Sequence, residues 1–243
     1  MLKISSFGKS DIGLRRSNNE DAFLVNVELG INVLADGMGG PAAGEIASDI
    51  FTKTALEVFL TNRVEFEPEC QEIIEDAYRI ANKRILDHTG THPHHKGMGC
   101  TAELLYFFDQ KFLLGHVGDS RTYLFRNEQL KQLTKDHSLV QQQLDQGLIK
   151  REQARTHRYR NVLLRAVGTS EILAVDILKG KVAPGDLFLL CSDGLTALVE
   201  DDSIRNAMAS GAGIDEKVEM LIQLAKTAGG HDNITVILTE VLQ

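Results

Sequence analysis

Five acidic sites stand at the ends of apolar segments, most of them beside glycine, and this pattern constrains the fold more than any other feature of the sequence. Aspartate is a poor strand residue, and a carboxylate at the mouth of a buried strand is costly unless it is compensated. One Asp-Gly pair usually marks only a turn. Five such sites in one domain would repel one another, so their convergence requires cations. The sites are Asn19-Glu20-Asp21, Ala35-Asp36-Gly37, Gly118-Asp119-Ser120, Ser192-Asp193-Gly194 and His231-Asp232-Asn233.

The available ligands indicate which cations these are. Carboxylates and glycine carbonyls, without a Cys/His set at metal spacing, select magnesium or manganese over zinc or copper. Two such ions about 3.5–4 Å apart form a hydrolytic site, in which an acidified bridging water attacks phosphorus in line. Arg16, four residues before Glu20, offers a bidentate grip on phosphate oxygens.

Composition narrows the class of protein. The chain has 243 residues, with 34 acidic and 26 basic side chains and a net charge of −8, so nucleic acid is not an expected partner. With only 4 Pro and no linker, residues 1–243 are expected to form a single domain. No apolar run approaches the ~18 residues of a membrane span, and the start lacks a signal-peptide stretch. Three widely spaced cysteines, Cys70, Cys100 and Cys191, indicate reduced thiols and a cytoplasmic protein.

The periodicity of apolar residues predicts runs of strands that are separate from runs of helices, which favours an α+β fold with antiparallel sheets. A hairpin is expected at 22–35, and a meander of four strands at 102–133. Further strands are expected at 187–191 and 234–241. The predicted helices begin at Pro41, span 68–86 and 137–154, and include the late apolar face from Ile214 to Ala225.

An ordered set of motifs resembles the metal-dependent protein Ser/Thr phosphatases (PPM type, also called type 2C), in particular their bacterial branch. The resemblance covers nearly the whole chain and implies a four-layer αββα sandwich of two antiparallel sheets flanked by helices. The motifs are Arg16-x-x-x-Glu20-Asp21-Ala22, Ala35-Asp36-Gly37-Met38-Gly39-Gly40, Gly97-Met98-Gly99-Cys100-Thr101, Gly118-Asp119-Ser120-Arg121, Leu164-Arg165-Ala166-Val167-Gly168, Ser192-Asp193-Gly194-Leu195 and Asp232-Asn233-Ile234-Thr235.

The resemblance also implies roles for single residues. Asp36 would bridge two metal ions, and the Gly37 carbonyl would bind one of them. Asp193 and Asp232 would complete the shell of the other ion, while Glu20 and Asp21 would hold metal-bound waters. Asp119, with Asp193, would bind a third metal. Arg16 would hold the substrate phosphate, and a flap at about 138–165 would lie beside the site.

Two positions depart from the family pattern. Animal members carry a histidine, a candidate general acid, where this chain has Met38, which cannot donate a proton. The bacterial flap often reads Thr-His-Pro, and here it reads Thr156-His157-Arg158. A metal-bound water and His157 remain the candidates for the proton donor, and His157 is also a candidate for substrate binding.

Three other patterns are less informative. Gly37-Met38-Gly39-Gly40-Pro41-Ala42 matches a dinucleotide fingerprint, but the helix after it leads to another helix, so no βαβ unit exists. His88, His92, His94 and His95 form a cluster that we expect to be a solvated loop, with adventitious metal binding as the alternative. Cys191 is expected to pack as a small apolar residue.

The sequence therefore predicts a protein Ser/Thr phosphatase that uses two or three manganese or magnesium ions. A metal-bridging hydroxide would attack the phosphorus without a covalent intermediate. The substrates would be phosphoproteins, among them a bacterial Ser/Thr kinase and its targets, and the protein would be a monomer. The alternatives are a non-catalytic relative that binds a kinase or phosphoprotein, and a phosphatase of a regulatory-switch protein.

Overall fold

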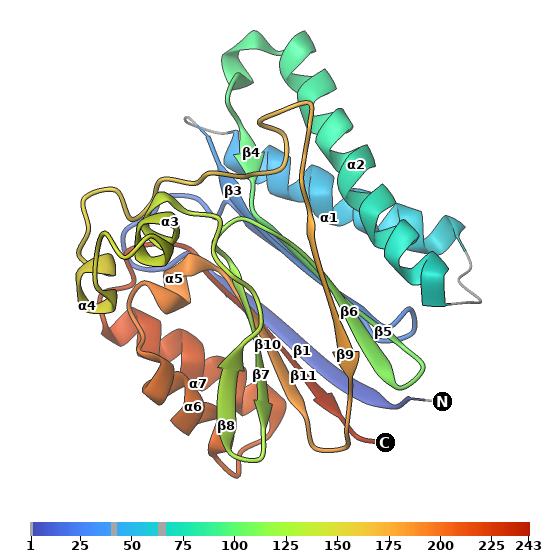
Figure 1. Cartoon of the computed structure of the whole chain (residues 1–243), viewed down its shortest axis with the longest axis vertical. Helices are drawn as coiled ribbons and strands as arrows, with labels where there is room; N and C mark the ends of the chain where they lie inside the picture. The colour runs from blue at the N-terminus through green and yellow to red at the C-terminus, as the bar shows by residue number, and fades with distance from the viewer. Residues whose placement is uncertain (1, 40–42, 63–66) are drawn as a thin grey trace.

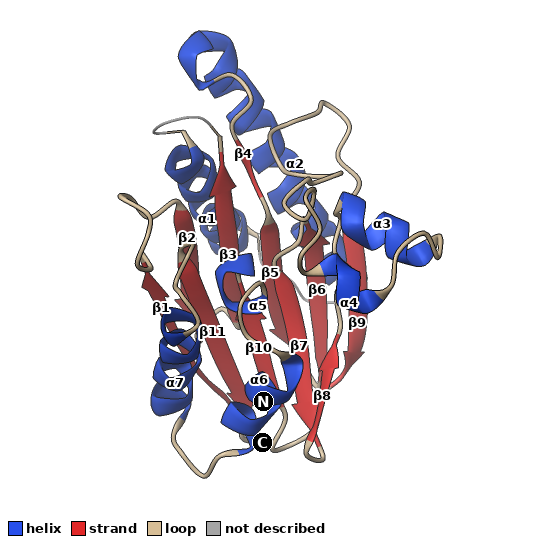
Figure 2. Ribbon diagram, turned by 90° about the vertical axis from the view of Figure 1, so that its left-hand side faces the viewer, coloured by secondary structure: helices blue, strands red, loops and turns tan. Residues whose placement is uncertain are grey.

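Two antiparallel sheets stacked face to face, with helices on both outer surfaces, make up the computed structural model of this chain (Figure 1). The structure describes residues 2–39, 43–62 and 67–243. Helices α1 and α2 cover one sheet, and α6 and α7 cover the other (Figure 2). The predicted α+β sandwich of two antiparallel sheets is confirmed.

The first sheet has the strand order β1-β11-β10-β7-β8. Its central strand β10 is buried at every residue, because its run of Leu, Phe and Cys packs on both faces. The edge strand β1 pairs with β11 along its whole length, from Ile4 to Asp11. The strands are β1 (Ile4–Asp11), β7 (Arg121–Arg126), β8 (Gln129–Gln132), β10 (Leu187–Cys191) and β11 (Ile234–Val241).

The second sheet has the order β2-β3-β5-β6-β9, and the short strand β4 also pairs with β3. The hairpin predicted at the N-terminal end is present, and its turn closes with a 3.2 Å hydrogen bond from Gly30 N to Val27 O. The strands are β2 (Asp21–Asn26), β3 (Ile31–Met38), β4 (Gly99–Cys100), β5 (Ala102–Phe108), β6 (Lys111–Val117) and β9 (Asp176–Lys181).

The helices divide into two outer layers and a group near the flap. Helices α1 (Gly44–Thr61) and α2 (Glu67–Thr91) pack together on the second sheet, followed by the short 3₁₀ helix η1 (Pro93–His95). Within the described residues, none of the helices combines the length and apolar character that crossing a bilayer requires. The others are α3 (Leu139–Asp145), α4 (Arg151–Ala154), α5 (Asp193–Thr196), α6 (Asp201–Ala209) and α7 (Ile214–Thr227).

Three apolar clusters hold these layers together. One lies between α1, α2 and the second sheet, around Phe51 and Tyr78, whose rings meet edge to face at 4.9 Å. A second lies between the first sheet and helices α6 and α7. The third fills the space between the sheets, where Phe188 packs against Phe107 and Phe112. The sandwich thus buries both faces of each sheet.

Some sequence expectations were wrong. The helix predicted at 137–154 is two short helices, α3 and α4, because the chain turns at Gly147 with a φ of +68°. The second helix continues to Thr91, five residues past its predicted end at Leu86. Strands β1 and β9 and helix α6 were not predicted, and the predicted helix start at Pro41 lies outside the described residues.

Candidate active site

The acidic residues singled out in the sequence converge in space, although they come from distant segments. Strands β2 and β3 pair so that Asp21 stands opposite Asp36. Asp193 follows β10 and Asp232 precedes the neighbouring strand β11, so the antiparallel pair brings the two together. The Asp193 carboxyl lies close enough to that of Asp36 for each to influence the pKa of the other. Asp119, which follows β6, is near enough to add to the electrostatic repulsion at Asp36. The structure therefore brings together all five predicted aspartates.

Hydroxyl groups hold the Asp21 carboxylate in place. Ser192 Oγ donates to Asp21 Oδ2 at 2.9 Å, and Thr235 Oγ1 donates to the same oxygen at 2.6 Å. Ser192 Oγ also accepts from Thr235 N at 3.0 Å. Thr235 lies on β11 and Ser192 directly follows β10, both strands of the first sheet, whereas Asp21 belongs to the second. These contacts tie the two sheets together at the acidic cluster.

Asn233 organises the loops around the cluster. Its Oδ1 accepts from Glu20 N at 2.9 Å, and its Nδ2 donates to Ile12 O and Asn18 O. The Glu20 carbonyl in turn accepts from Gly37 N at 3.1 Å. The chain segments carrying Glu20, Gly37 and Asp232 are therefore held as one unit.

Close backbone approach explains why glycine follows two of the aspartates. A Cβ atom on Gly37 would lie 2.2 Å from Gly44 O and 2.4 Å from Glu20 O. A Cβ atom on Gly194 would lie 1.9 Å from Asn233 O. No side chain fits at these distances, so the glycines serve the packing of the site as well as its turns.

The electrostatics of the cluster are unfavourable without a counter-charge. Burial, partly offset by the Thr235 and Ser192 hydroxyls and reinforced by the charge of Asp193, raises the pKa of Asp21 to about 7. Burial and the charge of Asp232 raise the pKa of Asp193 to about 6. For Asp36, burial and then the charges of Asp21 and Asp193 raise the pKa well above its ordinary value. The pKa of Asp119 is shifted in the same direction by burial and by Asp193. Like charges brought together in this way are an arrangement that a bound cation would stabilise.

Arg16 is the arginine that the sequence analysis placed beside the acidic cluster. Its Nη2 lies 2.7 Å from Asp232 Oδ2, and 44% of its side chain is exposed. The hydrogen bond to Asp232 raises the pKa of Arg16, and the charges of Glu20 and Asp36 add to the effect. Arg16 therefore stands at the solvent side of the carboxylates, where a phosphate group could reach it.

The donor set fits an oxygen-preferring divalent cation. The converging groups are carboxylates and a glycine carbonyl, which suit magnesium or manganese better than softer metals. Among the described side chains, no three His, Cys, Asp or Glu residues form a ready cage around a single point. The carboxylates meet in pairs instead, as Asp36 with Asp193 and Asp21 opposite Asp36. Water would have to complete any ion's shell, as magnesium-like ions require.

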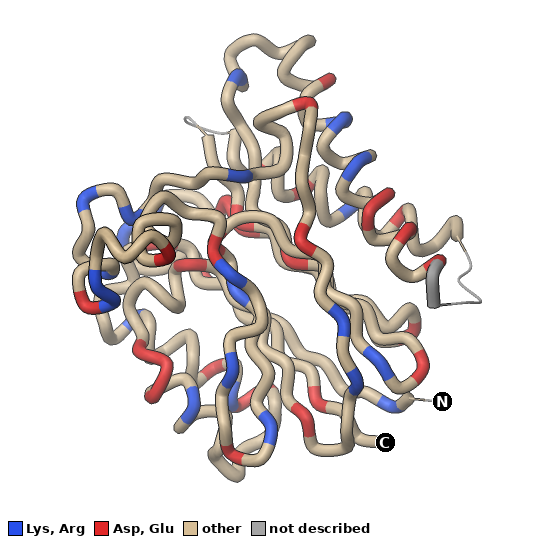
Figure 3. Tube along the Cα trace, in the orientation of Figure 1, with Lys and Arg blue, Asp and Glu red and all other residues tan. Residues whose placement is uncertain are grey.

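A small cavity of about 110 Å³ opens between the acidic cluster and the flap. Asp119 and Asp193 line one side, and Arg155, Arg160 and Asn161 line the other. Sequence analysis did not single out these flap residues, although the concentration of basic residues around α4 could have indicated them (Figure 3). Arg155 is ion-paired with Glu200, whereas Arg160 lines the space beside the carboxylates, where it would attract an anionic substrate.

His157 lies on the same flap but does not line this cavity. Its ring lies near Tyr159, with centroids 5.8 Å apart, and its Nδ1 accepts from Tyr159 N at 3.3 Å. Its expected contact with substrate stays a prediction.

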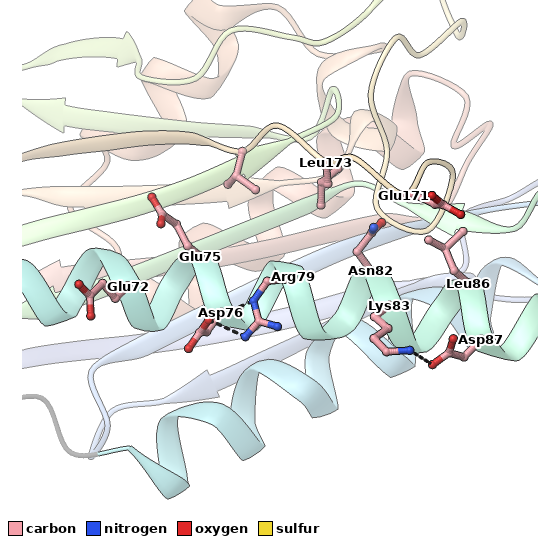
Figure 4. Close-up of a pocket in the computed structure, with 11 residues that line it drawn as sticks. Glu72, Glu75, Asp76, Arg79, Asn82, Lys83, Leu86, Asp87, Glu171 and Leu173 are labelled. Carbon is pink, nitrogen blue, oxygen red and sulfur yellow. Dashed lines mark hydrogen bonds and ion pairs between the residues drawn. The ribbon is translucent and has the colours of Figure 1, made fainter.

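A larger groove, of about 1090 Å³, runs along α2 and has a different character (Figure 4). Its two cations are already paired, Arg79 with Asp76 and Lys83 with Asp87, each at 2.8 Å. The groove also carries Glu72, Glu75 and Glu171. Because its charge is mainly negative and its cations are engaged, it is unsuited to phosphate.

The histidine cluster lies at the end of α2 and on η1. His88 is helical rather than in a loop, and its Nε2 lies 2.9 Å from His95 Nδ1. The His88 ring stacks on that of His92 with centroids 4.2 Å apart. Cys191 is buried, as expected, and so are Cys70 and Cys100.

The family model for protein phosphatase 2C matches residues 10–238 of this chain. Protein phosphatase PhpP of Streptococcus pneumoniae is 34% identical over 235 residues, which cover 96% of this chain and 95% of that protein. Serine/threonine protein phosphatase PstP of Mycobacterium tuberculosis is 37% identical over 96% of this chain and 44% of its own length. The crystal structure of the PstP catalytic domain in complex with two manganese ions superposes with a TM-score of 0.91 at 34% identity, covering all of both chains.

Proposed function

The chain belongs to the protein phosphatase 2C family and is a metal-dependent protein Ser/Thr phosphatase of the bacterial type, and from this premise we propose which residues carry out the reaction and on what substrates. We propose that the enzyme removes phosphate from phosphoserine and phosphothreonine of a bacterial Ser/Thr kinase and its targets. Residues 1–243 would act as one catalytic domain, monomeric and cytoplasmic.

The acidic cluster would hold two or three manganese or magnesium ions. Asp36, the Gly37 carbonyl, Asp193 and Asp232 would be ligands of the core pair. Glu20 and Asp21 would bind through water, and Asp119 with Asp193 would hold a third ion. When bound, such ions acidify a water molecule for attack on phosphorus and neutralise the developing charge. The observation that supports this assignment is the group of half-buried aspartates whose pKa values are raised by loss of solvent and then by their mutual repulsion.

Arg16 would change partners when the site is loaded. Its guanidinium now neutralises Asp232, a carboxylate that we assign to a cation. A cation on Asp232 would replace the guanidinium there, and Arg16 would then be free to bind two phosphate oxygens. Because the side chain is partly exposed, this exchange requires no movement of the sheets.

The flap would complete the binding of the phosphoprotein. Arg160 lines the small cavity together with Asp119 and Asp193, so it would attract the phosphorylated segment. Arg155, which is ion-paired with Glu200, would help to exclude water from it. Met38 has no proton to give to the leaving serine oxygen. That proton would come from water or from His157 on the flap.

The test is a comparison of three proteins with manganese and with EDTA. Wild type should hydrolyse an aryl phosphate and a phosphothreonine peptide only with manganese or magnesium. Asp36→Ala should abolish turnover, and Asp119→Ala should turn over slowly while calorimetry still finds two bound ions. Full activity of the metal-free wild type, or an Asp119→Ala variant that binds no metal, would contradict the assignment.

A further inference from the structure

A buried ion pair that the proposed reaction does not use lies within the second sheet, and one hydrogen bond links it to the first sheet. Glu103 on β5 and His116 on β6 stand opposite each other, and both side chains are 0% exposed. His116 Nδ1 is hydrogen-bonded to Glu103 Oε1. Thr122 Oγ1, from the other sheet, donates to Glu103 Oε2 at 2.6 Å. Such a pair is costly to bury and is retained where it specifies an arrangement.

The Glu103–His116 pair influences the protonation state of the neighbouring His137 ring. Both nitrogens of His116 face oxygen acceptors, Glu103 Oε1 and the Lys135 carbonyl at 2.9 Å. Burial opposes a charge there, but the Glu103 carboxylate raises the pKa of His116 to about 9, so the ring is cationic. The His137 ring packs on it with centroids 4.5 Å apart. Burial, together with the charge of His116, lowers the pKa of His137, so that ring is neutral.

The neutral His137 ring has one acceptor and one donor, and both are engaged. Its Nδ1 accepts from Gly118 N at 3.1 Å, so the proton resides on Nε2, which donates to Asp176 Oδ2 at 3.1 Å. The backbone makes a second contact with the same glycine, because His137 N donates to Gly118 O at 2.6 Å. Gly118, at a φ of +115°, directly precedes Asp119.

The same residue holds both ends of the flap. The next residue, Ser138, caps helix α3 at the start of the flap. At the other end, Leu164 N donates to His137 O at 2.7 Å. Arg165 Nη1 lies 2.7 Å from Asp176 Oδ1 and 3.2 Å from His137 Nε2. Asp176 thus links the returning stem of the flap to the His137 ring.

We propose that His137 is a positioning residue for the dephosphorylation reaction, which holds the Gly118–Asp119 strand end and the two stems of the flap in one fixed arrangement. It acts through Gly118 on one side and through Asp176 and Leu164 on the other. The buried Glu103–His116 pair packs against the His137 ring and holds it in place. The inference rests on the proposed roles of Asp119 and the flap.

Three substitutions distinguish the contact of His137 with Gly118 from its contact with Asp176. His137→Phe keeps a ring against His116 and removes both side-chain hydrogen bonds. His137→Asn places an amide oxygen near the Nδ1 position, so it restores the acceptor for Gly118 without restoring the bond to Asp176. Asp176→Asn, on a side chain that is 45% exposed, places an amide donor where Arg165 now finds an acceptor. The control is Tyr78→Phe, which removes one fully buried hydrogen bond, from Tyr78 Oη to Ala102 O at 2.9 Å.

Three measurements are made on the folded proteins: amide exchange, manganese calorimetry and steady-state kinetics. His137→Phe should speed exchange at 118–120 and throughout 138–165, and weaken the weakest manganese step and kcat by about tenfold, as the loss of supporting contacts around a metal site does. His137→Asn should restore 118–120 and the manganese isotherm but not the flap. Asp176→Asn should affect the flap alone, raising KM for a phosphothreonine peptide more than for an aryl phosphate.

The control decides between positioning and general support of the fold. Tyr78→Phe should lower the melting temperature without changing the exchange at 118–120 or 138–165. If His137→Phe changes exchange, manganese binding and kcat no more than Tyr78→Phe does, the proposal is overturned. If His137→Phe fails to fold, the local pattern in His137→Asn and Asp176→Asn decides instead, and unchanged flap exchange in both overturns the proposal. A wild type that binds only two manganese ions would refute the proposed third site, while the exchange data still test His137.

Discussion

Replacing Asp193 by asparagine should stabilise the metal-free protein while destroying its response to metal. Asp193 is half-buried beside Asp36 and Asp232, and the loss of solvent together with the charge of Asp232 raises its pKa from 3.8 to about 6. At pH 8 the wild type must therefore hold an ionised carboxylate in a place that disfavours it. The amide of Asp193→Asn would keep the shape and lose the charge, so repulsion within the cluster would fall.

The size of the effect follows from the shift in pKa. A difference of about two pKa units corresponds to about 3 kcal/mol between the two protonation states. Solvent reaches the site and screens part of the charge, so we expect about half of that, ~1.5 kcal/mol. For a chain of this length each kcal/mol moves the melting temperature by about 2–4 °C. Asp193→Asn should therefore melt about 3–6 °C above the wild type in EDTA at pH 8.

The pH dependence has a definite sign. A carboxyl whose folded pKa is raised lowers stability once it ionises, so the penalty is absent below 3.8, grows between 3.8 and about 6, and is complete above that. The advantage of Asp193→Asn should thus vanish as the pH falls from 8 to 4. Asp202→Asn, on an exposed side chain, is the control and should show no such change.

Manganese should reverse the order of the two melting temperatures. A ligand at about 100 times its dissociation constant stabilises the folded state by about 2.7 kcal/mol. The wild type should gain this, and Asp193→Asn should gain much less. Differential scanning fluorimetry with EDTA and with manganese measures the melting temperatures of both proteins in each condition. If Asp193→Asn melts below the wild type in EDTA at pH 8, the carboxylates do not repel one another and the electrostatic reasoning is wrong.

Three further substitutions, one of them with a matched control, test other parts of the structure. Because His157 faces Tyr159, His157→Ala should cause equal, small losses on a phosphoserine peptide and an aryl phosphate. A loss of about 10²-fold confined to the peptide would assign the proton transfer to His157. Gly194→Ala, whose Cβ would meet Asn233 O at 1.9 Å, should lower the free energy of unfolding by about 1–3 kcal/mol and reduce activity. Gly211→Ala, whose Cβ would meet open space, should do neither. Glu103→Leu should destabilise the protein by about 1–3 kcal/mol in urea, because it leaves the buried Thr122 hydroxyl and His116 Nδ1 without their shared hydrogen-bond partner; no measurable loss would contradict that pairing.

The elements that the sequence predicted well are those whose side chains are buried on both faces. Strands β5, β10 and β11 have the predicted bounds, since continuous apolar runs leave little choice of structure. Strands β1 and β9 were missed because both lie at sheet edges and carry half-buried, mostly polar residues. Their pairing with β11 and β6 is a long-range event that local periodicity does not record.

The flap shows a second limit of local patterns. Its polar run from His137 to Ala154 has helical composition, but the chain is broken at Gly147 and Ser138 is extended. What determines its course is the contact of His137 with Gly118 and Leu164. These partners lie 19 and 27 positions away along the chain, so the tertiary structure overrides the local preference for helix.

The acidic site was predictable because five carboxylates at the ends of apolar segments are unusual in one domain, whereas the Glu103–His116 pair becomes visible only through the register of a hairpin. Glu103 interrupts one apolar strand and His116 interrupts the next, with a two-residue turn at Asp109-Gln110 between them. Each stands six residues from that turn, and a two-residue turn pairs residues equidistant from it. The sequence thus already implied that the two face each other, as they do. Composition could not reveal that His137 packs on this pair from another part of the chain, because that contact exists only once the two sheets have stacked.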